Sequence, residues 1–204
     1  MPLVKIYAST PSSVKPYSLS NEELLDIGRL VRACAEIDDI INLHLYNLAD
    51  ITEGTGIILL GRMPTSARLN LVEAFAKSKG PEQVESYRQA FGNEHYKAII
   101  RCRNTVAHGT LMGVTDNDLV AFQVQDTQGV GDNKVITTVN AYSHDAFGQF
   151  AGQAEDIIPQ METKFGLRAL RENRRAPTLS PHSKSQPKEP RKARRRPPLL
   201  TWLL

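Results

Sequence analysis

Three polar residues near the middle of the chain have the types and the spacing needed to cleave a phosphodiester bond. Arg103 and Asn104 are adjacent, and His108 follows four positions after the asparagine. Histidine exchanges protons near neutral pH, and the planar, permanently charged guanidinium of arginine fits two phosphate oxygens. Residues four apart share a helix face, so the amide can orient the imidazole or the phosphate. The sequence predicts His108 as general acid or base, Arg103 as phosphate clamp and Asn104 as orienting residue.

The spacing also limits how a single chain can use these residues. Arg103 and His108 are five positions apart, about 140° around an ideal helix, so they face different directions unless the helix unwinds at its end. Two copies that meet along this helix would bring both pairs into one cleft, so we expect a symmetric homodimer. Arg101 lies nearly on the face of His108 and is a second candidate to bind the phosphate. Glu94 and His95 would supplement the site if the chain brought them inward.

A helix that ends at this motif must position these side chains. Residues 82–107 carry apolar side chains at helical spacing and follow Pro81, which suits a first helical turn. We expect one helix here, bent or broken near Gly92. Gly109 is the residue type that ends helices in the left-handed conformation, which would place His108 at or beside the C-cap. The helix dipole there favours a protonated imidazole, as a general acid requires.

Two further helices are expected before the motif. Ser20 and Glu23 predict the start of a long helix over roughly residues 21–49, with Asp38 on its apolar stripe. Residues 52–61 hold three glycines and predict a connection, with residues 57–60 buried against the helices. A second helix is expected from a cap at Thr65 or Ser66 through about residue 77.

The periodicity changes after the motif. Residues 119–124 and 134–139 are β-branched or alternating and flank a segment rich in Gly, Asp and Asn, which predicts a β-hairpin over about residues 118–140. Ser143 then caps a last helix, expected over residues 145–172 with a kink at Pro159. We therefore expect an N-terminal extension over residues 1–18, a helical domain over 19–172 and a disordered tail over 173–204.

Charge is distributed unevenly along the 204 residues. Residues 1–167 hold 14 Lys and Arg against 20 Asp and Glu, a charge of −6, whereas residues 168–204 hold 11 against 2, a charge of +9. The expected folded part therefore lacks the broad basic face that tracks a nucleic-acid backbone, so any RNA contact on it must be local. The basic tail is either an arm that holds RNA non-specifically or a solvated extension.

The remaining composition favours a protein of the cell interior. With 41% hydrophobic residues, the chain can form one compact domain. Cys34 and Cys102 both lie in apolar helical patterns, so we expect two buried thiols and a reducing, cytoplasmic setting. There is no apolar run of the roughly 18 residues that a membrane span needs, and the two cysteines and five histidines lack metal-ligand spacing. We expect no membrane partner, no metal and no cofactor.

The segment from Arg101 to Gly109 resembles the R-N-x-x-x-H signature of HEPN domains, more generally written R-x4-6-H. The resemblance carries over Arg103, Asn104 and His108 and covers the order of helices over roughly residues 20–110. It implies a mainly α, up-and-down helical bundle, here with a β-hairpin between the motif helix and a C-terminal helix. Many HEPN proteins are metal-independent ribonucleases that act as dimers, so the resemblance implies cleavage of RNA.

The resemblance leaves other functions open. Similar proteins serve as toxins of toxin-antitoxin systems or as defence nucleases, which would add an antitoxin protein to RNA and a second copy as partners. The alternative is a non-catalytic HEPN-like module that binds RNA, a nucleotide or a protein and keeps the motif for structure. A helical adaptor with a buried motif is a third possibility.

Overall fold

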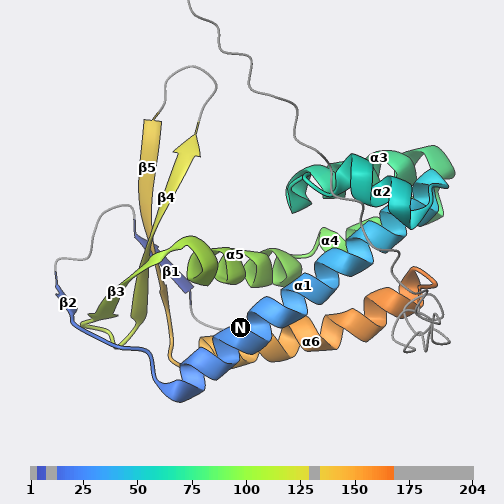
Figure 1. Ribbon diagram of the computed structural model, residues 1–204. Helices are drawn as coiled ribbons and strands as arrows, with labels where there is room; N and C mark the ends of the chain where they lie inside the picture. The colour runs from blue at the N-terminus through green and yellow to red at the C-terminus, as the bar shows by residue number, and fades with distance from the viewer. Residues whose placement is uncertain (1–3, 8–12, 129–133, 168–204) are drawn as a thin grey trace, which may run out of the picture.

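A computed structural model describes residues 4–7, 13–128 and 134–167, which form a helical body with an antiparallel sheet at one end (Figure 1). The fold is mainly helical, as expected. The helices are α1 (Asn21–Ala49), α2 (Glu53–Leu60), α3 (Thr65–Lys79), α4 (Pro81–Phe91), α5 (Glu94–His108) and α6 (Ala146–Lys164). The strands are β1 (Val4–Tyr7), β2 (Val14–Lys15), β3 (Thr110–Thr115), β4 (Val120–Gln128) and β5 (Lys134–Tyr142).

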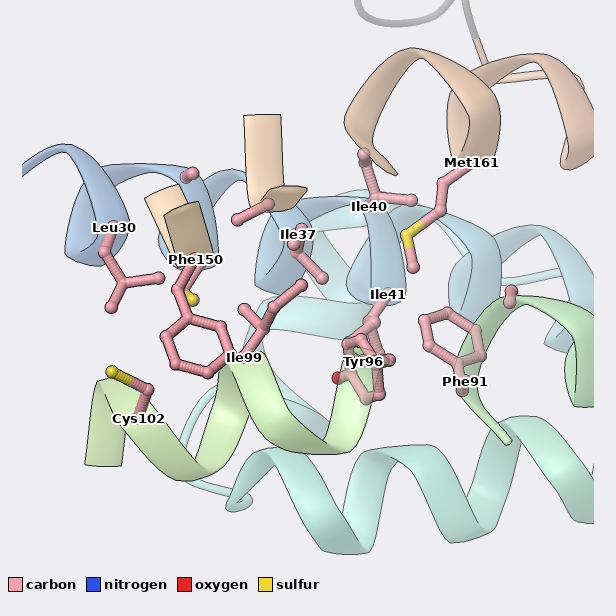
Figure 2. Close-up of a cluster of buried hydrophobic side chains, with 14 of the residues drawn as sticks. Leu30, Ile37, Ile40, Ile41, Phe91, Tyr96, Ile99, Cys102, Phe150 and Met161 are labelled. Carbon is pink, nitrogen blue, oxygen red and sulfur yellow. The ribbon is translucent and has the colours of Figure 1, made fainter. Parts of the chain in front are cut away.

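The long helix α1 forms the centre of the body. Its start confirms the predicted cap and shows that it is a capping box: the Ser20 hydroxyl accepts from the Glu23 backbone N–H, and the Glu23 carboxylate accepts from the Ser20 N–H. The inner face of the middle of α1 is fully buried, with Ile37, Ile40 and Ile41 at 0% exposure. Figure 2 shows Ile37 of α1, Ile99 of α5 and Phe150 of α6 meeting in one core. Because three helices share this apolar centre, the position of α5 is fixed along its inner face.

The segment before the motif is two helices and not one, so the predicted break at Gly92 is confirmed. Helix α4 ends at Phe91, and Asn93 begins α5 with a side chain that accepts from the Tyr96 backbone N–H at 2.8 Å. An asparagine N-cap satisfies one of the donors that a helix start leaves open. The motif helix is therefore the separate, fifteen-residue α5.

The predicted hairpin is also confirmed, as β4 and β5, but it belongs to a larger sheet. The order is β1-β5-β4-β3-β2, with every neighbouring pair antiparallel. Strand β3, which was not predicted, begins directly after α5 and contains a register shift between Leu111 and Gly113. Gly113 has φ 138° and faces the backbone of Lys15 so closely that a Cβ would lie 2.1 Å from its carbonyl oxygen. Strands β1 and β2 lie within the expected N-terminal extension.

The predicted connection over residues 52–61 is wrong, since residues 53–60 form α2, capped by the Thr52 side chain. Its predicted burial is also wrong for three of four residues. Ile57, Ile58 and Leu59 are 56%, 83% and 64% exposed, and only Leu60 is buried. The reason is the docking of α2 on Gly56, where a Cβ would lie 2.2 Å from the Tyr46 ring. That close approach turns Gly56 and Leu60 inward and the other apolar residues outward.

The last helix is shorter than the predicted 145–172. It ends at Lys164, where Gly166 takes φ 65° and the Leu167 N–H donates to the Glu162 carbonyl, a glycine-terminated helix end. Its N-cap is Asp145 and not the predicted Ser143, and Pro159 lies inside it. Helix α3 likewise begins at Thr65, with Pro64 in the cap position. The predicted disordered tail lies outside the described residues. None of the helices that the structure describes is long and apolar enough to cross a bilayer.

Candidate functional site on the motif helix

The end of α5 differs from the predicted left-handed cap. The helix continues through His108, and Gly109 has φ −82° and ψ 155°, which is extended backbone, so that prediction is wrong. The chain must enter β3 immediately, and an extended residue makes that turn. Glycine is favoured for a different reason, because a Cβ at position 109 would lie 2.4 Å from the Thr105 carbonyl oxygen and 3.3 Å from the Gln123 carbonyl oxygen and the Phe122 Cβ. The motif helix thus ends where Gly109 turns to extended backbone.

One buried residue within the motif, Thr105, anchors this helix end to the sheet. Its hydroxyl accepts from the Asn140 amide at 2.8 Å and from the Tyr142 hydroxyl at 3.0 Å, and it donates to the Arg101 carbonyl. Thr105 is 2% exposed. Thr105 received no role in the sequence analysis, although its position between Asn104 and His108 could have marked it as part of the site. A polar group this deeply buried must be hydrogen-bonded, so the network fixes how α5 presents its outer face.

Polar residues follow one exposed face of α5 at alternating spacings of three and four. We call Lys97, Arg101, Asn104 and His108 the α5 stripe; all four are exposed. The His108 ring makes no hydrogen bond or ion pair with any residue that the structure describes. Asn104 and His108 share one face of this regular helix, as predicted, and Arg101 lies beside them on the same face. These side chains are open to a ligand.

Arg103 faces a different direction from His108. Its Nη2 lies 3.6 Å from the Asp38 Oδ2 on α1, and its Nη1 donates to the Asn104 Oδ1 at 2.9 Å. The helix is not unwound at its end, so within one chain the offset expected from ideal geometry remains. The structure therefore brings Arg103 and Asn104 together, and Asn104 but not Arg103 shares the face of His108.

Asp38 connects three helices at this point. Its Oδ1 accepts from the Thr65 hydroxyl at 2.9 Å and lies 3.8 Å from the Arg68 Nη2, both on α3. Its side chain is 22% exposed, and those of Arg68 and Arg103 are 13% and 30% exposed. Two guanidinium groups thus share one carboxylate, which leaves one positive charge in excess. Sequence reasoning noted Asp38 as a charge on an apolar stripe but gave it no partner; it named Thr65 only as a candidate helix cap and missed Arg68.

A cavity of about 280 Å³ opens beside Asp38 between α1, α3 and α5. Its wall is formed by the side chains of Leu69, Ile100, Tyr96, Cys34, Thr65 and Ser66, together with Pro64, Asp38, Arg103 and Asn104. Burial raises the pKa of the Cys34 thiol to about 11 and also raises the pKa of the Tyr96 hydroxyl, so both groups are neutral at physiological pH. The cavity therefore combines neutral inner groups with charged groups from Asp38 and Arg103.

The other candidates lie elsewhere. Glu94 is at the start of α5, paired with Lys97 at 2.8 Å, and His95 is exposed beside it. Glu94 and His108 are fourteen positions apart on the helix, roughly 21 Å along its axis, so one chain does not bring them together. Cys34 and Cys102 are buried free thiols, as predicted. Among the described residues no three His, Cys, Asp or Glu side chains are grouped in a way that could hold a metal ion.

Comparison with known proteins gives this chain no relatives. It matches no protein-family model, and neither the curated proteins nor the solved structures yielded a similar protein. The geometry of α5 and the resemblance of its motif are therefore the features that point to a function.

Proposed function

We propose that this chain is a metal-independent endoribonuclease of the HEPN type that acts as a homodimer. The observation that carries the proposal is the exposed His108 at the end of α5, on one face with Arg101 and Asn104, in a mainly helical fold. An imidazole without a partner among the described residues is available to exchange a proton with a substrate. The motif resemblance supplies RNA as the substrate.

The chemistry needs a proton transfer and a cation. The 2′-hydroxyl loses its proton and attacks the adjacent phosphorus, the bond to the 5′-oxygen breaks, and that oxygen takes up a proton. His108 transfers one of these protons, while a guanidinium stabilises the additional negative charge on the phosphate oxygens. The products are a 2′,3′-cyclic phosphate and a free 5′-hydroxyl. Asn104 positions the phosphate, since it lies on the stripe and is hydrogen-bonded to Arg103.

A dimer resolves the offset between Arg103 and His108. Asp38 holds Arg103 away from the His108 face of its own chain. In a two-fold assembly along α5, the His108 of one copy approaches the Arg103 of the other, and the assembly contains two such sites. The same resemblance suggests a toxin or defence nuclease, whose activity an antitoxin protein would block.

The test is cleavage of single-stranded RNA by the purified full chain in EDTA. We expect wild-type protein to cleave and His108→Ala to lose at least about 100-fold in rate, the contribution typical of general acid or base catalysis. His95→Ala is the matched control, because His95 is also an exposed histidine of α5 but lies at its other end. Equal cleavage by wild type and His108→Ala would overturn the proposal.

One observation favours a second candidate, a non-catalytic module that binds RNA or a nucleotide. Arg103 is already paired with Asp38 at a cavity, an arrangement suited to holding a ligand without reacting with it. In that case RNA would bind to the wild-type protein and remain intact. His108→Ala would then leave both the binding and the RNA unchanged.

A further inference from the structure

The cavity beside Asp38 presents three different surfaces to a ligand. Ser66 and Asn104 are exposed and mark its mouth, where Arg103 is partly exposed as well. Leu69 and Ile100 supply an apolar wall. A mouth with a cation and an amide, followed by an apolar interior, fits a ligand with an anionic end and a flat apolar body.

Tyr96 is one of the two buried residues, with Cys34, that line this cavity. The residue is 4% exposed, and its hydroxyl has no hydrogen-bond partner among the described residues. Figure 2 shows its ring among the core side chains near Ile41 and Phe91. Buried hydroxyls are nearly always hydrogen-bonded, so an unpartnered one on a cavity wall points to a polar atom of a ligand.

The charges around the cavity favour an anion. Arg68 and Arg103 flank the single carboxylate of Asp38, and Arg68 Nε is a second buried donor without a partner among the described residues. Arg103, the cation of the cavity wall, donates to Asn104, which belongs both to the cavity wall and to the α5 stripe. A nucleic-acid strand that lies along the stripe therefore passes the mouth of the cavity.

We propose that this cavity receives the base of one unpaired nucleotide and that Arg103 and Asn104 hold its phosphate at the mouth. A volume of about 280 Å³ equals roughly nine water molecules at about 30 Å³ each, room for one base with part of its sugar. The Tyr96 hydroxyl bonds a polar edge of the base, and Leu69 and Ile100 pack on its face, as in recognition of unstacked bases. An RNA strand and a free mononucleotide share this chemistry. The proposal that the nucleotide belongs to an RNA strand rests on the proposed function.

The experiment measures binding separately from cleavage. The full chain is titrated with each of the four ribonucleoside 5′-monophosphates, with inorganic phosphate, and with a short single-stranded 2′-O-methyl RNA, which cannot be cleaved because it has no 2′-hydroxyl. Ser66→Trp fills the mouth from α3, and Ser78→Trp is its matched control, because Ser78 is an exposed serine of α3 that does not line the cavity. Tyr96→Phe removes only the hydroxyl.

We expect at least one mononucleotide and the RNA to bind the wild type, and Ser66→Trp to weaken both more than about tenfold while Ser78→Trp has no effect. Tyr96→Phe should weaken binding about three- to tenfold, the loss of one hydrogen bond, without lowering the thermal midpoint. Tighter binding of the oligonucleotide than of any mononucleotide identifies an RNA strand as the ligand, and the reverse order identifies a free nucleotide.

The inference is overturned if no nucleotide or RNA binds, if inorganic phosphate binds as tightly as the mononucleotides, or if Ser66→Trp binds like the wild type. Its failure is distinguishable from failure of the proposed function. Cavity-dependent binding without any cleavage sustains the inference and removes the nuclease. Cleavage that His108→Ala abolishes and Ser66→Trp leaves unchanged sustains the nuclease and removes the cavity as its nucleotide site.

Discussion

Arg103 and His108 lie on one continuous helix, yet Arg103 Nη2 is 3.6 Å from Oδ2 of Asp38 whereas His108 is exposed to solvent. The two residues of the motif thus have different surroundings within one chain. Arg103 is positioned by α1 and borders a cavity, and His108 is positioned by the turn into β3. The proposed reaction therefore draws Arg103 from one copy and His108 from the other.

Asp38→Asn should destabilise the protein. The substitution removes the only acidic partner that the described residues give to both Arg68 and Arg103, whose side chains are less than one third exposed. We expect the free energy of unfolding to fall by about 1–2 kcal/mol, because a partly buried charge is left without its counter-charge. Chemical denaturation measures the change.

The neighbouring residue provides the control. Asp39 is exposed, so Asp39→Asn should change the free energy of unfolding by less than about 0.5 kcal/mol. Equal effects of the two substitutions would show that Asp38 does not connect the three helices as described.

Gly109→Ala should also destabilise the fold. A Cβ there would lie 2.4 Å from the Thr105 carbonyl oxygen and 3.3 Å from two atoms of β4, so the helix end must move. We expect a loss of about 1–3 kcal/mol, as for overpacking in a core. Gly28→Ala is the contrasting variant: nothing lies within 4 Å of a Cβ in the middle of α1, so it should stabilise by up to about 1 kcal/mol. If Gly109→Ala left the thermal midpoint of unfolding unchanged, the close contact at position 109 would be contradicted.

The helices could be predicted from the sequence where local signals agree with packing. The capping box at Ser20 and the apolar period of α1 are local, and so is the break at Gly92, which is why these predictions were confirmed. The predicted burial of residues 57–60 was wrong because their orientation depends on the approach of Tyr46 to Gly56, which is a tertiary contact. The predicted left-handed conformation of Gly109 was wrong because the chain enters β3 directly in extended backbone, and the space for a Cβ is limited by the Thr105 carbonyl oxygen and by β4.

The site was predictable only in part, for the same reason. The residue types of the motif and the offset between Arg103 and His108 follow from sequence and helix geometry. The pairing of Arg103 with Asp38 joins residues 65 positions apart, and the Thr105 network depends on β5. Strands β1, β2 and β3 are short or irregular and have no strong alternating pattern. Such long-range contacts leave no local signal in one sequence.

Stability should depend on pH through Glu23 and His144, whose Oε1 and Nδ1 lie 2.9 Å apart. The bond with Glu23 raises the pKa of His144 against the opposing effect of partial burial. Burial raises the pKa of Glu23, but hydrogen bonds from the Ser20 backbone N–H, Tyr17 and His144 together bring it below its usual value. His144 therefore stabilises the fold fully below about pH 6.5, and Glu23 above about pH 4.5.

Their joint contribution is largest between these two pH values. It declines as pH rises through the raised pKa of His144 and as pH falls through the lowered pKa of Glu23. His144→Gln should remove the loss of stability that the wild type shows as pH rises through the pKa of His144. The loss amounts to less than about 1 kcal/mol because the ring is partly exposed. Thermal midpoints between pH 5 and pH 8 measure it, with His95→Gln as control. An unchanged pH profile in His144→Gln would refute the pairing.

The central claim is that each reactive site takes Arg103 from one copy and His108 from the other. The measurement that tests it most directly is RNA cleavage by an equimolar, subunit-exchanged mixture of Arg103→Ala and His108→Ala, after circular dichroism has shown both variants to be folded dimers. Each variant alone should be inactive. Half of all dimers in the mixture should contain one copy of each variant, and each of these should hold one intact site of two, so about a quarter of wild-type activity should return. A mixture as inactive as either variant alone would contradict the account.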